Sequence, residues 1–148
     1  MTDALPTVTA SLTAGTTVRL AAREHTWSGD EPAEKGGADE GATPYEQLLG
    51  ALATCTAITL RMYAQHKGMD LASVEITSRF SRELAKDCPE HELDDDTKLD
   101  VIRSDVVLQG TFDDAQRERL TQVAGRCPVH KTLDGGPFMV ERVRFEPA

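Results

Sequence analysis

The 148-residue sequence predicts an α+β protein in which an antiparallel sheet packs on one long central helix. The strand-like and helix-like segments do not alternate as parallel β-α-β units would, which favours an antiparallel sheet. Residues 44–67 form a helix-like run with apolar side chains on nearly every side, so the helix needs cover all round. The length matches one domain, residues 1–148, that can bury a sizeable core.

The composition narrows the class of protein. The net charge of -9 argues against a nucleic-acid partner, because binding to phosphate backbones relies on a basic surface. No apolar run is long enough to span a bilayer, and the N-terminus lacks the order of charges of a signal peptide. We therefore expect no membrane partner and a cytoplasmic location. Three cysteines without an export signal predict no structural disulfide framework, so any pairing is catalytic or redox-responsive.

The N-terminal part predicts short strands and then a loop. Residues 8–27 mix β-branched side chains with a turn signal at Gly15, which is typical of a hairpin. Residues 28–44 collect glycine, proline and acidic side chains without an apolar period, as loops do.

The start and end of the long helix are marked by local signals. Thr43 can serve as the N-cap, Pro44 suits the first helical position, and Glu46 completes a capping box. Gly68 ends the run after about 24 residues. Because the first four turns have no broad polar face, we expect the helix to be largely buried. A sheet on one side and a second subunit on the other would supply that cover, which predicts a homodimer.

The second half of the chain predicts two strands, two helices and a last strand. An acidic connection at 84–98 separates the two strands, and the first of the two helices begins at Asp113 or Asp114 and ends near Gly125. The predicted strands lie at 73–83, 99–110 and 138–146, and a short helix follows a turn at Pro128.

Two cysteines could carry chemistry, and each also has a structural interpretation. Cys55 lies about three turns into the long helix, too far from its N-terminus for the helix dipole to lower its pKa. Without a nearby cation it would be a buried apolar residue. Cys127 has Arg126 and His130 as cationic neighbours and precedes a helix start, an environment that suits a thiolate. It could equally be a cysteine packed under a turn.

A metal site is a further alternative. Cys88 and His91, like Cys127 and His130, have the Cys-x-x-His spacing, and two such pairs would give four ligands for zinc. That site would leave Cys55 without a role. The acidic surroundings of the first pair also fit a solvated loop.

The segments "GATPYEQLLGALATCTAITLRMYA" and "RCPVHKTL" together resemble the OsmC/Ohr family, the osmotically induced protein C and organic hydroperoxide resistance proteins. Residues 25–44 are more similar to a less characterised OsmC-like branch. The resemblance implies the OsmC-like fold and an intertwined homodimer with two sites at the subunit interface. It also implies a thiol-dependent peroxidase with Cys55 as the peroxidatic and Cys127 as the resolving cysteine. Such an enzyme acts on organic hydroperoxides or hydrogen peroxide without a metal or other cofactor. A dithiol reductant, such as a lipoyl protein, then reduces the disulfide.

The sequence departs from the organic hydroperoxide resistance proteins at the start of the long helix. Those proteins carry a catalytic glutamate directly after the proline, where this chain has Tyr45, and Glu46 follows one position later. At about 100° per residue, Glu46 lies half a turn out of phase with Cys55 while Tyr45 lies closer to its direction. The carboxylate role therefore transfers poorly, which favours an alternative function: a non-catalytic OsmC-like protein that binds a small apolar ligand or senses redox state.

Several other side chains could support the cysteines. The family pairs its glutamate with an arginine that steadies the thiolate, and Arg19 and Arg23, expected on an N-terminal strand, are the candidates. Arg61 lies on the wrong side of the helix from Cys55. Thr56 and Thr59 can hydrogen-bond a buried polar group or bond back to their own helix. Arg126 and His130 could instead assist Cys127.

Overall fold

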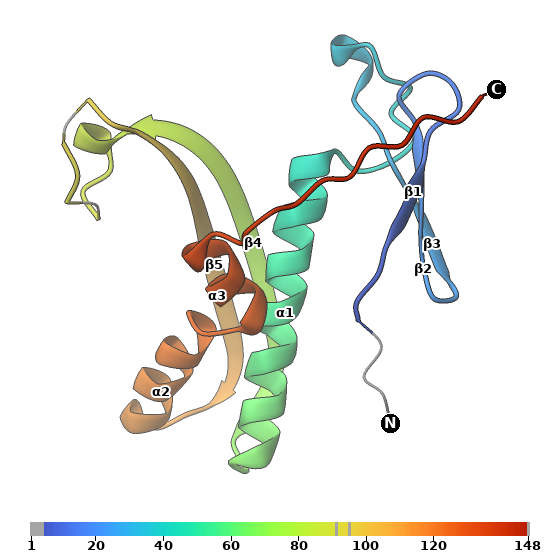
Figure 1. Cartoon of the computed structure of the whole chain (residues 1–148). Helices are drawn as coiled ribbons and strands as arrows, with labels where there is room; N and C mark the ends of the chain where they lie inside the picture. Colours follow the sequence, from blue (N-terminus) through green and yellow to red (C-terminus); the bar gives the residue numbers. More distant parts are fainter. Residues whose placement is uncertain (1–4, 91, 95, 148) are drawn as a thin grey trace. The chain divides into compact units, whose positions relative to one another are not determined.

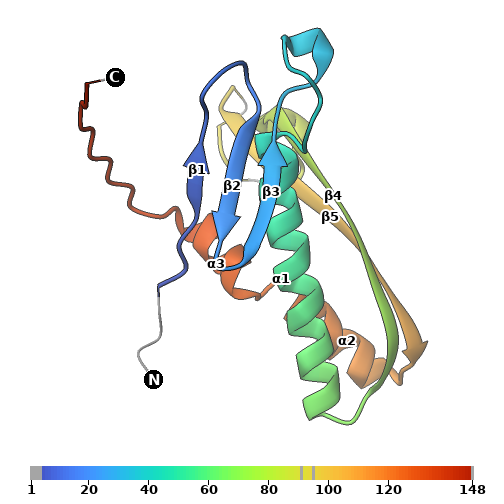
Figure 2. The same ribbon diagram turned by 90° about the vertical axis from the view of Figure 1, so that its right-hand side faces the viewer.

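The computed structural model of the protein describes residues 5–90, 92–94 and 96–147 and shows a mixed α and β chain (Figures 1 and 2). The strands β1–β3 form one sheet, and β4 and β5 form a two-stranded sheet. This arrangement confirms the predicted α+β class with antiparallel sheets. The elements in chain order are β1 (Thr9–Ser11), β2 (Val18–Ala22), β3 (His25–Gly29), the 3₁₀ helix η1 (Ala33–Lys35), α1 (Pro44–His66), β4 (Asp70–Leu84), the 3₁₀ helix η2 (Ala85–Asp87), β5 (Lys98–Thr111), α2 (Asp114–Ala124) and α3 (Pro128–Gly135).

The chain divides into two compact units. The first unit contains residues 1–51 and 78–103, and the second contains residues 52–77 and 104–148. The elements α1, β4 and β5 each run from one unit into the other. The single domain at 1–148 stays a prediction.

The sheet of the first unit is an antiparallel meander. β1 pairs with β2 and β2 pairs with β3, so the predicted hairpin is present and the chain adds a third strand to it. Arg19 lies in β2, opposite Ser28 of β3. The prediction that Arg23 lies on a strand is wrong: it occupies the tight turn before β3, with a φ of 55°. A tight two-residue turn between antiparallel strands needs a residue with a positive φ, and Arg23 takes that position. Arg23 therefore lies outside the backbone hydrogen bonds that pair β2 with β3.

The loop between β3 and α1 is organised by one buried carboxylate. Asp30, 3% exposed, accepts hydrogen bonds from the hydroxyls of Thr16 (2.7 Å) and Thr17 (3.0 Å). It also accepts backbone N–H bonds from Glu31, at 2.8 Å, and Glu40, at 3.2 Å. The bond from Thr16 is the largest influence on the Asp30 carboxyl, and together the donors hold its pKa far below the usual range. An ionised Asp30 thus fixes the path of a loop that has little regular structure.

The predicted ends of the long helix are confirmed. The Thr43 N–H donates to Glu46 Oε2 (2.8 Å), and the Glu46 N–H donates to Thr43 Oγ1 (3.3 Å), which completes the capping box before Pro44. At the other end Gly68 has a φ of 63°, the left-handed conformation that glycine adopts without strain.

The core of the second unit forms around the C-terminal half of α1. Leu60 of α1 and Leu120 and Val123 of α2 are buried together, and the partly buried residues packed on them are Tyr63, Met69, Val74, Val106, Leu108, Phe112 and Ala124. Both views show α2 following the end of β5 beside this part of the helix (Figures 1 and 2). The helix α2 starts at the predicted position, with Asp113 as N-cap in a capping box with Gln116.

The single chain covers only part of the long helix, and the predicted cover by a second subunit stays a prediction. The buried residues of α1 are Leu52, Thr56, Leu60 and Ala64, a narrow stripe with a spacing of four. Ile58 and Met62 are 53% and 64% exposed. Apolar composition required cover on every side, but the chain itself covers one side only. No helix in the described residues is long and apolar enough to cross a membrane.

The predicted final strand is also absent. Residues 136–147 have no regular secondary structure, and Phe138, Val143 and Phe145 are 94%, 75% and 94% exposed. Alternating apolar residues favour a strand only where a neighbouring strand accepts its backbone groups. Among the described residues no backbone hydrogen bond joins this segment to a strand.

Candidate functional site

The structure brings Cys55 and Cys127 together in the second unit. Cys55 lies in the middle of α1 and is partly exposed, whereas Cys127 precedes α3 and is 0% exposed. Both thiols are free, and the Cys55 side chain is one of the groups that lower the pKa of Cys127. Two cysteines 72 positions apart (127 minus 55) are therefore neighbours.

Cys127 holds its position as the N-cap of α3. Its backbone is extended, with φ -66° and ψ 155°, and Pro128 follows at the start of the helix, where its missing N–H costs nothing. The Cys127 Sγ accepts a hydrogen bond from the His130 backbone N–H at 3.3 Å. This is the bond that an N-cap serine or aspartate oxygen usually makes, so the sulfur faces the electropositive end of a helix.

A second donor reaches the same sulfur from a different helix. Thr56 of α1 is 5% exposed, and its Oγ1 lies 3.4 Å from Cys127 Sγ. Its hydroxyl thus bonds to a partner 71 positions away. By contrast, Thr59 donates to the carbonyl oxygen of Cys55 at 2.7 Å, the bond within the helix that its position predicts.

These donors decide the acidity of Cys127. Burial has the largest single effect on this thiol and raises its pKa, but the hydrogen bonds from Thr56, the His130 and Val129 backbone and Cys55 together outweigh burial and lower the pKa. Hydrogen bonds to the charged form of a group favour that form. Cys127 therefore has the environment of a stabilised thiolate.

Arg126 and His130 are the expected cationic neighbours of Cys127, and the assistance of their side chains to this thiol stays a prediction. His130 donates its backbone N–H to the Cys127 sulfur. Arg126 is exposed, and its guanidinium has no hydrogen-bond or ion-pair partner in the part of the chain that the structure describes. Neutral donors surround this thiol. The sequence signal for Thr56 was available but weak: a polar residue at a buried-stripe position of a helix needs a buried partner.

Two of the predicted supporting residues, Tyr45 and Glu46, lie at the start of α1 in the first unit. The Tyr45 ring stacks on Phe80 with centroids 4.3 Å apart, and the Tyr45 hydroxyl accepts a hydrogen bond from Arg82 at 3.2 Å. Arg82 also forms an ion pair with Asp100 at 3.0 Å. The backbone N–H of Thr43 is the main reason that the pKa of Glu46 is lowered, so this carboxylate is engaged in capping its own helix.

The two candidate arginines of the first unit are both exposed. Arg19 lies in a shallow pocket of about 440 Å³ whose lining includes Ser11, Thr26 and Ser28. Within residues 5–90, 92–94 and 96–147, neither Arg19 nor Arg23 has a hydrogen-bond or ion-pair partner. The helix arginine Arg61 has a structural role, donating to the carbonyl oxygens of Leu71 and Ala72.

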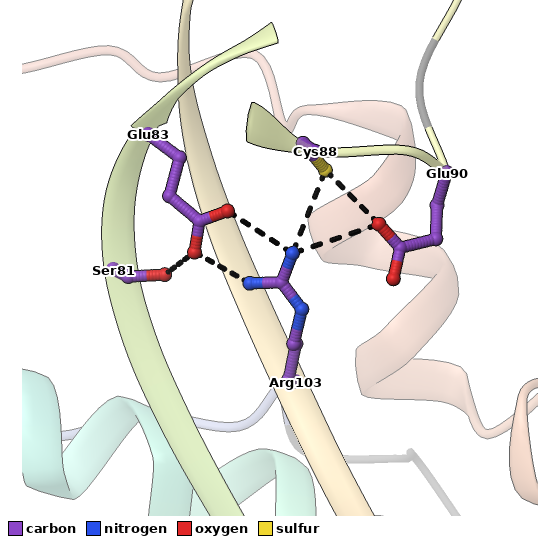
Figure 3. Close-up of polar contacts among 5 residues, drawn as sticks. All are labelled: Ser81, Glu83, Cys88, Glu90 and Arg103. Carbon is purple, nitrogen blue, oxygen red and sulfur yellow. Dashed lines mark hydrogen bonds and ion pairs between the residues drawn. The ribbon is translucent and has the colours of Figure 1, made fainter. Parts of the chain in front are cut away.

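The third cysteine lies in a charged cluster of the first unit (Figure 3). Arg103 of β5 donates to both carboxylate oxygens of Glu83, at 2.5 and 3.0 Å, and its Nη2 lies 3.6 Å from Glu90. Cys88 is 5% exposed, and its thiol donates to Glu90 at 3.4 Å. Burial is the main cause, and the Glu90 carboxylate the second, of a raised pKa for Cys88. The raised pKa favours the protonated form of this thiol.

The zinc alternative finds little support in this cluster. A thiol that donates to a carboxylate beside a guanidinium is a poor thiolate ligand. No group of three potential metal ligands occurs among the described residues, and His91 lies outside them.

Comparison with known proteins supports the resemblance seen in the sequence. A sequence model described as OsmC-like protein matches residues 36–141. The chain is similar in structure to an OsmC-like protein from Mycoplasma pneumoniae, with a TM-score of 0.70, 21% identity and 90% of each chain covered. It is similar to an organic hydroperoxide resistance protein OsmC from Legionella pneumophila, with a TM-score of 0.62, 20% identity and coverage of 90% of this chain and 93% of that one.

An organic hydroperoxide resistance protein from Elizabethkingia anophelis also shares the fold, with a TM-score of 0.61, 14% identity and coverage of 90% of this chain and 92% of that one. At these identities the structural matches establish the fold alone. Among curated protein sequences, none matches the chain significantly. The family match covers well over half of the residues, and the chain therefore belongs to the OsmC-like protein family.

Proposed function

We propose that this protein is a thiol-dependent peroxidase that reduces organic hydroperoxides or hydrogen peroxide through Cys55 and Cys127. The observation that supports it best is the proximity of the two side chains, through which Cys55 lowers the pKa of Cys127, since a peroxidase of this kind needs two cysteines that can form a disulfide. Two proteins of similar structure are named organic hydroperoxide resistance proteins, which supports the same chemistry.

The assignment of roles rests on access to the two sulfurs. Cys55 is partly exposed and Cys127 is 0% exposed, so a peroxide meets Cys55 first. The Cys55 thiolate attacks one peroxide oxygen, the O–O bond breaks, and the other oxygen leaves as water or an alcohol after it takes a proton. The Cys55 sulfenic acid then condenses with the Cys127 thiolate to form a disulfide and release hydroxide, which is protonated to water.

A dithiol reductant completes the cycle. Two electrons and two protons from the dithiol return both cysteines to the thiol form, and the reductant leaves as its own disulfide. A lipoyl protein is one carrier of suitable chemistry. This cycle needs no metal or organic cofactor, and we place it in the cytoplasm, where cysteines are kept reduced.

We propose that an arginine assists Cys55, with Arg19 and Arg23 as the two candidates. Both guanidinium groups lack partners in the described residues, so either is available to a thiolate. Activity lost in Arg19→Ala and kept in Arg23→Ala, or the reverse, would identify the residue.

We also propose that the working form is a homodimer. The exposed apolar side chains of α1, Ile58 and Met62, and those of the C-terminal segment, Val143 and Phe145, are the surfaces that a second copy would cover. Light scattering of the purified chain should give the mass of a dimer. A monomer at every concentration would contradict the proposal.

The peroxidase proposal is tested by Cys55→Ser. We expect this variant to lose consumption of cumene hydroperoxide and of hydrogen peroxide in the presence of a dithiol, because it lacks the nucleophile. Cys88→Ser is the matched control and should keep the activity. Full activity in Cys55→Ser would disprove the proposal, as would a wild-type protein that reacts with peroxide no faster than free cysteine.

A further inference from the structure

Cys127 has more hydrogen-bond donors than a resolving cysteine needs for forming a disulfide. The Thr56 hydroxyl lies at 3.4 Å and the His130 N–H at 3.3 Å from its sulfur, and they come from two different helices. Both donors are neutral and both point at a group that is 0% exposed. They would stabilise negative charge on this sulfur whenever the charge develops.

The reductive half of the cycle is where such charge develops. A disulfide has two sulfurs, and a nucleophilic thiolate attacks one of them while the other leaves as a thiolate. The better leaving group is the sulfur whose thiolate is more stable. Access favours the same direction, because Cys55 is partly exposed whereas Cys127 is buried.

We propose that Thr56 is a positioning residue that holds Cys127 as the leaving thiolate, so that the dithiol reductant attacks the Cys55 sulfur of the Cys55–Cys127 disulfide. The inference rests on the proposed function, since it concerns reduction of the disulfide that the peroxidase forms. Thr56 touches neither peroxide nor reductant and acts only through Cys127.

The electron balance of this step is simple. A reductant thiolate forms a new S–S bond to Cys55, the bond between the two cysteines breaks, and its electron pair stays on Cys127. The second thiol of the reductant, as thiolate, then attacks the reductant sulfur of this mixed disulfide. The reductant leaves as a cyclic disulfide and Cys55 leaves as a thiolate, so two electrons have passed from the dithiol to the protein.

The chain offers a matched control for Thr56. Thr59 lies three positions later in the same helix, and its hydroxyl donates to the Cys55 carbonyl oxygen at 2.7 Å. Thr59→Val therefore removes a hydroxyl from α1 without removing a donor to Cys127. Thr56→Val removes that donor at nearly constant volume, and Thr56→Ser restores it.

The first experiment locates the attacked sulfur in the wild-type protein. The disulfide is made with diamide, an oxidant that does not depend on peroxidase activity, and is treated briefly with glutathione as a monothiol probe. Free thiols are then alkylated, and peptides are mapped by mass spectrometry. We expect glutathione on Cys55 and the alkyl group on Cys127. Glutathione mainly on Cys127 would overturn the proposal.

The second experiment measures the rate at which dithiothreitol reduces the same disulfide in each variant over a range of pH. We expect Thr56→Val to be slower by about three- to tenfold, the effect of one hydrogen bond to a developing charge. The Thr56→Ser and Thr59→Val variants should match the wild type. Titration of the reduced variants by ultraviolet thiolate absorbance should show a higher pKa of Cys127 in Thr56→Val only. A purely structural role of Thr56 would not raise this pKa.

The outcomes separate this inference from the proposed function. If diamide forms the disulfide but peroxide does not, the peroxidase proposal fails while the direction of attack is still measured. If Thr56→Val fails to fold, the glutathione map of the wild type decides. Equal rates in folded Thr56→Val and wild type would contradict the role of Thr56.

Discussion

Cys127 and Cys88 are two buried thiols whose pKa values are shifted in opposite directions. They are 0% and 5% exposed, and each lies against polar groups. Burial raises the pKa in both cases. Around Cys127 the sulfur accepts hydrogen bonds from neutral donors and its pKa is lowered, whereas Cys88 donates to the Glu90 carboxylate and its pKa is raised. At Cys88 burial and then the Glu90 carboxylate raise the pKa despite the Arg103 guanidinium, whereas at Cys127 the hydrogen-bond donors outweigh burial.

The comparison also shows that a nearby cation is not sufficient to lower the pKa of a buried thiol. Cys88 has the Arg103 guanidinium at 3.6 Å, yet that charge is shared with Glu83 and Glu90. Among the described residues, no cation contributes to the lowered pKa of Cys127, yet it is the more acidic thiol. A search for reactive cysteines by neighbouring arginine would choose the wrong residue of these two.

The largest expected effect separates the two cysteines by function. Cys127→Ser should turn over much more slowly than wild type, because its Cys55 sulfenic acid has no resolving thiol in the protein and must react with the external dithiol. Cys88→Ser should turn over at nearly the wild-type rate. Peroxide consumption with a dithiol present measures both. A wild-type rate in Cys127→Ser, or a lost activity in Cys88→Ser, would contradict these roles of the two cysteines.

A smaller effect concerns the acidity itself. Ultraviolet thiolate absorbance can be titrated in two double variants, Cys55→Ser/Cys88→Ser for Cys127 and Cys55→Ser/Cys127→Ser for Cys88. We expect the thiolate of Cys127 to form below, and that of Cys88 above, the free value of about 8.5. Adding Glu90→Gln should lower the pKa of Cys88, because an amide carries no charge to oppose the thiolate. The same pKa for both thiols would contradict the structural explanation.

The smallest effect is expected at His130. Its contribution to Cys127 is the backbone N–H at 3.3 Å, which His130→Ala keeps. The titration of Cys127 and the peroxidase rate should both stay close to wild type, in contrast to Thr56→Val. A pKa of Cys127 that rises in His130→Ala would show that the imidazole matters after all.

Local sequence signals predicted the elements that local interactions determine. The start of α1 at Thr43 and Pro44, the stop at Gly68 and the cap at Asp113 all depend on neighbours within four positions. The helix start at Cys127 and Pro128 belongs to the same class. Family resemblance then predicted which cysteines belong together.

Features that depend on distant residues were missed. The exposure of Ile58 and Met62 follows from what covers α1, and the missing strand at 138–146 follows from the absence of a neighbouring strand, which no periodicity reveals. The bond between Thr56 and Cys127 spans 71 positions. From sequence, the cationic side chains beside Cys127 are the stronger candidates, because a helical threonine such as Thr56 can equally bond back to its own helix.

The most direct test of the central claim is to find which cysteines pair when the protein meets peroxide. Reduced wild-type protein is treated with one equivalent of cumene hydroperoxide, free thiols are alkylated, and the peptides are mapped without reduction. We predict a disulfide between Cys55 and Cys127, with Cys88 recovered as the alkylated thiol. A disulfide that includes Cys88, or three alkylated cysteines after the peroxide is consumed, would contradict it.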